Sequence, residues 1–369
     1  MFKKEDTNRC KGVAILLLFF HHLFYTSEYI DKYKLTSLVG IDIKAIMKVA
    51  VEARVCVWLF VFLSAYGLSY QYKSYKEGKL KFVLHRQFQL LKGFWIIFVI
   101  MFILQSVIMH NTGSIYKGNF LYIFLDFMGW SDFLGTPLLR GVWWYMSLAQ
   151  VLIIVIPFLY EIVKKLGYYS ILFSFLAIQF IPEGITSASG GNYINYLMVA
   201  VLAILIMQKN MFSVFKKDLK ENKLKAIIRF IALLGGTILI LYCRMLMVDD
   251  VRRMRSVLAA FSCLGIVMLF YQFKLSFVGK VLEFIGKHSG NMYMTHRFIY
   301  GLFPQIIFFS KSIELSFVAL IVISLTASLL TEGLKNILRY NIWMDKLENL
   351  FWSSNLLKRI AIIDKRENQ

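Results

Sequence analysis

The sequence predicts an all-α protein, a polytopic membrane bundle of about ten transmembrane helices with both termini in the cytoplasm. Hydrophobic residues make up 58% of the 369 residues, and the mean hydropathy of +0.62 is well above that of a soluble domain. Several apolar runs approach or exceed the length that a helix needs to cross a bilayer. Lysine and arginine are concentrated between alternate runs, a pattern typical of cytoplasmic loops.

Ten segments are predicted to cross the membrane. The fifth and sixth are short, which favours tilted or irregular helices. A further apolar run, 119–130, is too short to cross and fits a re-entrant or interfacial segment. The predicted spans are 12–28, 50–70, 88–109, 142–162, 168–181, 193–208, 227–247, 256–273, 291–309 and 315–334.

The distribution of positive charge supports this count. With the N-terminus inside, 29 of the 42 lysine and arginine residues fall in segments assigned to the cytoplasm. This bias accounts for the net charge of +20, so we expect no nucleic-acid partner. Residues 1–335 are predicted to form one membrane domain, and 336–369 an amphipathic, charged tail on the cytoplasmic membrane surface.

The N-terminal segment and the cysteines argue against secretion and metal binding. His21 and His22 stand where a signal peptide would have small residues for cleavage, so the first apolar run is predicted to be a retained span. The four cysteines are isolated, and no Cys/His ligand spacing occurs. The sequence therefore predicts neither a disulfide framework nor a metal site.

The first span combines a basic foot with two histidines near its far end. Lys11 and His22 are eleven residues apart, about 1100° of helical rotation, so they share a face and lie about 16 Å apart along the axis. Arg9 and His21 are about 120° out of register. The His22 imidazole can take a proton from a hydroxyl and return it to a leaving group. The alternative is a hydrogen bond that fastens His22 to a neighbouring helix.

Four basic residues gather at the cytoplasmic ends of the first and third spans: Arg9, Lys11, Arg86 and Lys92. They can bind phosphate groups, or they can extend to lipid headgroups, and the sequence leaves both interpretations open.

Near the outer side, Trp144 and Tyr145 open the fourth span, where aromatic residues form an interfacial belt or contact a ligand. Glu52 and Arg54 begin the second span near the depth of His22, either as an ion pair or as groups that orient the imidazole.

An outer arginine cluster breaks the charge bias. It consists of Arg244, Arg252, Arg253 and Arg255. Because basic residues are disfavoured on the outer side, the cluster either meets an anionic or polar acceptor or is neutralised. The neutralising groups would be Asp249 and Asp250, or anionic lipid headgroups.

His296, in the stretch that begins at Gly286, is a further histidine predicted inside the membrane. Two intramembrane histidines with flanking cations suggest a reaction centre or a proton path.

The chain resembles the acyltransferase-3 family of bacterial integral membrane acyltransferases over about residues 8–335, because four motifs follow one another in the order expected for that family. The family pattern opens with a basic residue, ten intervening residues and a histidine, as Lys11 and His22 do here. The other motifs are the Phe-rich run ending in Ser64-Ala65-Tyr66, with Ala65 in place of the family's glycine, the Trp144-Tyr145 span, and the stretch from Gly286 to His296.

The resemblance implies transfer of an acetyl group from cytoplasmic acetyl-CoA to a hydroxyl of an exported glycan. The acceptor would be a cell-surface, capsular or exopolysaccharide glycan or a lipid-linked saccharide, at the plasma membrane of a bacterium. His22 would be the general base or a transient acyl carrier, and His296 is the second catalytic candidate. The implied donor site contains Lys11, Arg9, Arg86 and Lys92, and the implied acceptor path contains Trp144, Tyr145, Arg54, Arg252 and Arg253.

One departure from the family concerns the donor site. The family's Arg-x-x-Arg entering the third span reads Arg86-Gln87-Phe88-Gln89 here, so Lys92 or His85 would have to complete the site.

Two other functions compete with this interpretation. One is a proton-coupled transporter or glycan flippase that uses His22 and His296 as a relay. The other is a sensor or scaffold that binds lipid or partner proteins, and a homo-oligomer is compatible with any of the three.

Overall fold

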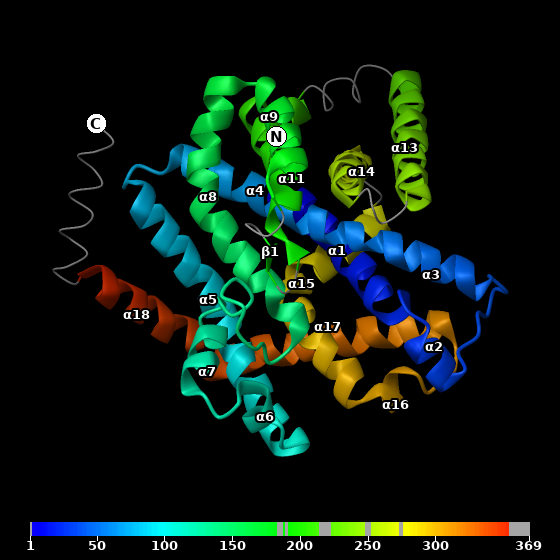
Figure 1. Cartoon of the computed structure of the whole chain (residues 1–369), viewed down its shortest axis with the longest axis vertical. Coiled ribbons are helices and arrows are strands. Elements are labelled where there is room, and N and C mark those ends of the chain that lie inside the picture. Colours follow the sequence, from blue (N-terminus) through cyan, green and yellow to red (C-terminus); the bar gives the residue numbers. More distant parts are fainter. Residues whose placement is uncertain are drawn as a thin grey trace.

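The structure is a computed structural model that describes residues 2–182, 187–188, 191–213, 223–247, 252–272 and 276–353. Within these ranges the regular secondary structure is helical, apart from a hairpin of β1 (Ser187–Ala188) and β2 (Gly191–Asn192) (Figure 1). The longer helices are α1 (Lys4–Phe24), α3 (Ile43–Glu52), α4 (Cys56–Ser74), α5 (Lys79–Leu104), α8 (Trp144–Leu166), α9 (Tyr169–Phe180), α11 (Leu197–Gln208), α13 (Lys223–Leu246), α14 (Arg252–Gln272), α15 (Ser276–Leu302), α17 (Ile313–Ile337) and α18 (Tyr340–Ser353). The shorter ones are α2 (Glu28–Tyr33), α6 (Thr112–Tyr116), α7 (Phe120–Phe127), α16 (Pro304–Ile307), the 3₁₀ turns η1 (Ala53–Val55), η3 (Gly141–Trp143) and η4 (Tyr193–Tyr196), and the π-helical turn η2 (Gln105–Met109).

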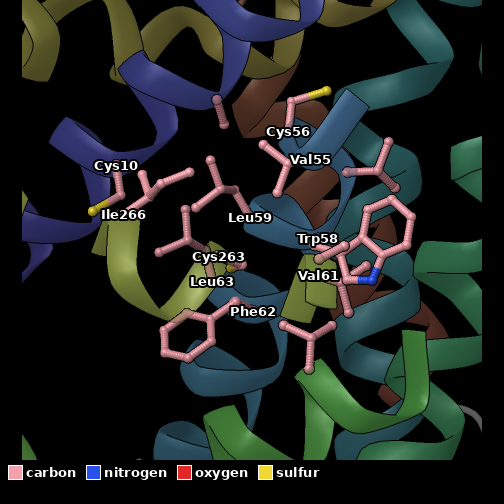
Figure 2. Packing of buried hydrophobic residues seen from close by; sticks show 14 of the residues in the cluster. Cys10, Val55, Cys56, Trp58, Leu59, Val61, Phe62, Leu63, Cys263 and Ile266 are labelled. Atoms are coloured by element: carbon pink, nitrogen blue, oxygen red, sulfur yellow. The ribbon is translucent and has the colours of Figure 1, made fainter. Parts of the chain in front are cut away.

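Helix α1 lies at the centre of the bundle, where it contacts α3, α4, α14, α15 and α17. Ile15 and Phe19 of α1 and Leu59 and Phe62 of α4 are fully buried in the core. In Figure 2, Leu59 of α4 points toward Cys10 of α1 and Ile266 of α14, whereas Trp58 and Val61 point to the other side of α4. Each of these two central helices is therefore covered by neighbours on several sides.

Two glycines bring α1 and α15 into backbone contact. A Cβ atom at Gly12 would overlap the carbonyl oxygen of Leu282, and one at Gly286 would overlap that of Asn8. Small residues at a crossing allow helices in a membrane to approach this closely. The crossing fixes the register of the two helices that carry His22 and His296.

A helix occupies each of the ten segments predicted to cross the membrane. Five helical segments of the described chain are long and apolar enough to span a bilayer: Lys79–Met109, Gly141–Leu166, Leu224–Leu246, Arg253–Tyr271 and Ile313–Ile337. Helices α9 and α11 are apolar but shorter, as predicted for the fifth and sixth segments. The protein is an all-α, multi-pass membrane protein. The count of ten spans and the cytoplasmic position of both termini stay predictions.

Two helices extend well beyond the predicted spans. Helix α5 begins at Lys79 and α15 at Ser276, so both helices start well before the predicted spans at 88 and 291. Polar residues near the middle of α15 have partners on α17. His288 Nδ1 lies 2.9 Å from Ser328 Oγ, and Asn291 donates to Glu332 over 2.8 Å. The hydropathy of α15 alone gives no sign of these partners.

The predicted tail contains α18, which packs on α5 through its polar face. His85 Nδ1 and Gln89 Nε2 lie 2.5 and 2.7 Å from the Glu348 carboxylate, and Lys92 Nζ lies 2.6 Å from Asp345 Oδ1. The opposite face exposes apolar side chains, namely Ile342, Trp343, Leu347, Leu350 and Phe351. This exposed face is consistent with the predicted location of the tail at the membrane surface.

Candidate active site

Two cavities lie along one side of α1, α4 and α8. On each helix the residues of the two cavities follow one another at helical spacing, so the cavities line the same face of the bundle. The pairs are Lys11 and His22 on α1, Ser64 and Phe60 on α4, and Ala149 and Tyr145 on α8. We name the cavity with Lys11 the inner cavity and the cavity with His22 the outer cavity, after the sides that the charge pattern predicts.

The inner cavity has a volume of about 610 Å³ and is strongly basic. Lys3, Lys4, Lys11 and Arg86 line it, and among the described residues no acidic side chain does. Arg86 stands over the ring of Phe82, with 5.7 Å between its guanidinium carbon and the ring centroid. Its Nε is buried and has no hydrogen-bond partner within the described ranges. Four cations around one space can bind an anionic group such as a phosphate.

The structure does not bring Arg9 or Lys92 into the inner cavity. Arg9 points away from Lys11 and forms an ion pair with Asp6. Lys92 is paired with Asp345 of α18, and the other suggested substitute, His85, is paired with Glu348. Gln89, which stands at the position of the family's second arginine, also contacts α18, because it donates to Glu348. Lys3 and Lys4 occupy the place that these residues were predicted to fill.

The outer cavity has a volume of about 300 Å³ and brings together four predicted residues. His22, Arg54, Trp144 and Tyr145 all line it, and so does His21. His21 was predicted to lie out of register, but adjacent residues on a helix can both border a broad cavity. His296 is fully buried behind the wall and contacts His22 from there.

Backbone carbonyls orient His21 and His296. His21 Nδ1 lies 2.8 Å from the Ala50 oxygen, and His296 Nδ1 lies 2.6 Å from the Tyr293 oxygen. Because a carbonyl only accepts, each Nδ1 carries a proton, and in the neutral ring each Nε2 is an acceptor. The Nε2 of His296 is buried, and no described residue donates to it.

The His22 ring is close to both of these imidazoles. Its centroid lies 5.1 Å from that of His21 and 5.2 Å from that of His296. Within the described residues, the His22 nitrogens have no hydrogen-bond partner, so both nitrogens are left for a ligand or for a neighbouring imidazole.

Aromatic side chains complete the outer cavity. Tyr293 of α15 also lines it, and its hydroxyl donates to the carbonyl of Val142. Its ring centroid lies 5.8 Å from that of Tyr145. Trp143 is fully buried instead, and its Nε1 donates to the Met294 oxygen over 3.0 Å. These two hydrogen bonds join the start of α8 to α15, and the sequence contained no signal for either.

Glu52 neutralises part of the outer arginine cluster. Glu52 pairs with Arg244 at 2.7 Å and with Arg255 at 3.1 Å, not with Arg54. Arg253 donates to the backbone oxygen of Gln179. The Arg252 side chain, Asp249 and Asp250 lie outside the described residues. Arg253 is not among the described residues that line the outer cavity.

Glu52 is therefore predicted to stabilise the bundle. We expect Glu52→Gln to lower the free energy of unfolding by about 3–5 kcal/mol, because it leaves the buried Arg244 without its charge partner. The matched control is Glu283→Gln, which breaks an exposed pair with Lys287 and should cost about 0–1 kcal/mol. Thermal unfolding of both variants in the same detergent measures the difference, and equal losses would contradict the prediction.

Comparison with known families decides what class of protein carries this pair of cavities. The sequence matches the family model of an acyltransferase domain, that of acyltransferase-3, over residues 7–333. The chain belongs to the acyltransferase-3 family. It is a membrane acyltransferase, and the matched region includes all of the residues that line the outer cavity. No curated protein and no solved structure matches the chain.

The acyltransferase-3 motifs explain why the predicted and observed sites agree only in part. Lys11, Arg86, His22, Trp144 and Tyr145 belong to motifs and line the cavities. Lys3 and Lys4 resemble ordinary orientation charges in the sequence, so reasoning from motifs missed them. In the part of the chain that the structure describes, no group of three or more His, Cys, Asp or Glu side chains could hold a metal ion.

Proposed function

We propose that this protein transfers an acetyl group from acetyl-CoA to a hydroxyl of an exported cell-surface, capsular or exopolysaccharide glycan. One observation carries the proposal: a basic cavity and a histidine cavity follow each other along the same face of α1, α4 and α8. The protein would lie in the plasma membrane of a bacterium, with the basic cavity facing the cytoplasm.

The two cavities match the two ends of the proposed donor. Acetyl-CoA carries its phosphates at one end and its thioester at the end of an extended arm. Lys3, Lys4, Lys11 and Arg86 would hold the phosphates. The arm would then extend along the bundle toward His22, which lies about 16 Å from Lys11 along the α1 axis.

His22 would perform the proton transfers. It removes the proton from the acceptor hydroxyl as the hydroxyl oxygen attacks the carbonyl carbon of the thioester. The carbon–sulfur bond breaks, the acetyl group becomes an ester of the acceptor, and His22 returns the proton to the departing thiolate. In a second route a His22 nitrogen carries the acetyl group before the hydroxyl attacks. Either route converts thioester and alcohol into ester and free thiol.

His296 would position His22. Its Nε2 is an acceptor without a partner in the described residues, and its ring is adjacent to His22. If His22 directs its N–H toward this nitrogen, its other nitrogen is left unprotonated as the base. A buried acceptor would then be satisfied, and the reactive tautomer would be selected.

The proposal is tested by thiol release in proteoliposomes. Purified protein, acetyl-CoA on the side of the basic cavity and a glycan acceptor on the other side should yield free thiol and O-acetyl groups in equal amounts. Absence of both products with every acceptor would overturn the proposal. Proton-coupled movement of the glycan without thiol release would favour the transporter instead.

Replacing cations of the inner cavity should weaken donor binding. We expect Lys11→Gln and Arg86→Gln each to raise the KM for acetyl-CoA by about tenfold, the value of one or two charge-assisted hydrogen bonds, with a smaller effect on kcat. Arg9→Gln and Lys92→Gln are matched controls, because these residues face Asp6 and Asp345 instead. The donor site would lie elsewhere if the controls raised KM more than the cavity variants.

A further inference from the structure

The outer cavity contains a single charged side chain among its described residues. Arg54 lines it together with histidines, aromatic rings and aliphatic side chains, and no carboxylate is present in this wall. The guanidinium of arginine stays ionised under all conditions in which proteins are active. Any ligand of the outer cavity therefore meets a fixed positive charge near His22.

The nearest candidate for a counterion is already engaged. Glu52 directs one carboxylate oxygen to Arg244 and the other to Arg255. Arg54, two residues along the chain, is exposed and has no acidic partner among the described residues. The Tyr196 hydroxyl forms a side-chain hydrogen bond with Arg54 and does not neutralise its charge. Folding thus leaves Arg54 available while it neutralises the buried arginine beside it.

From this geometry we infer that the acceptor is an anionic saccharide. Its carboxylate or phosphate binds Arg54, and the hydroxyl to be acylated then lies over His22. The forked donors of a guanidinium match either of these planar or tetrahedral anions. Trp144 and Tyr145 supply aromatic faces to the sugar rings. This inference rests on the proposed function, because it names the acceptor class of the same site.

A binding experiment tests the inference without turnover. Protein in nanodiscs is titrated by calorimetry with three tetrasaccharides: one that contains glucuronic acid, its carboxyl-reduced neutral form, and a phosphorylated form of the neutral chain. We expect at least one charged probe to bind about tenfold tighter than the neutral one. Which charged probe binds more tightly distinguishes a carboxylate from a phosphate.

Variants assign any preference to Arg54. Arg54→Gln should abolish the preference for the charged probes and leave neutral binding unchanged, whereas Arg54→Lys should keep part of it. Lys48→Gln is the matched control, because Lys48 is an exposed cation on the adjacent α3 that does not line the cavity. The inference is overturned if wild type binds the three probes equally, or if Arg54→Gln keeps the preference.

The outcome for Arg54 is separable from that of the proposed function. Thiol release by wild type reports on acetyl transfer, and the titrations report on the charge of the ligand. Arg54 is exposed and has no acidic partner among the described residues, so its replacement should not unfold the bundle. We expect Arg54→Gln to unfold at the same temperature as wild type, which a thermal unfolding measurement checks.

Discussion

His22→Ala is expected to abolish O-acetylation and thiol release while the protein remains folded. A positioned general acid–base contributes about 10²–10⁴-fold to a rate, and the His22 ring borders the outer cavity and contacts His296. Two measurements report the loss of activity: the rate of thiol release in proteoliposomes, and the O-acetyl content of the surface glycan by NMR.

His21→Ala is the matched control for this variant. His21 borders the same cavity, but its Nδ1 is bound to the Ala50 oxygen, so we expect it to orient the wall rather than to transfer protons. We expect a loss of less than about tenfold, the cost of one neutral hydrogen bond. Unchanged acetylation in His22→Ala would remove His22 from the mechanism, and a larger loss in His21→Ala would exchange the two roles.

Gly286→Ala is expected to disrupt both folding and activity. The added Cβ would overlap the carbonyl oxygen of Asn8, which belongs to the backbone of α1 and has no rotamer with which to move aside. Overpacking of this kind costs about 1–3 kcal/mol and shifts helices apart. Because α1 carries His22 and α15 carries His296, the shift would also separate the two rings, whose centroids lie 5.2 Å apart.

Gly290→Ala provides the control on the same helix. A Cβ at Gly290 meets no atom within 4 Å, and alanine favours the helix by about 1 kcal/mol over glycine. Its unfolding temperature should therefore be equal to that of wild type or higher, whereas that of Gly286→Ala should fall. If the two variants unfold alike, close backbone contact does not determine the crossing of α1 and α15.

Local patterns in the sequence predicted most of the helices. Apolar runs, charge bias and the spacing of Lys11 from His22 depend on residues within one or two helical turns, or on a single helix axis. For this reason a helix occurs in every predicted span. Helices α5 and α15 extend beyond the predicted spans, and polar residues on them have partners on α18 and α17, which a local pattern does not contain.

The site depended on contacts that no local pattern contains. The sequence by itself determined an all-α membrane acyltransferase with a basic residue and a histidine on one face of its first helix. Only the tertiary structure placed Lys3 and Lys4 beside Arg86, removed Arg9 and Lys92, and gave Glu52 to Arg244 rather than to Arg54. The physical reason is that a charge pairs with whichever opposite charge packing brings within reach, and that choice is made between helices.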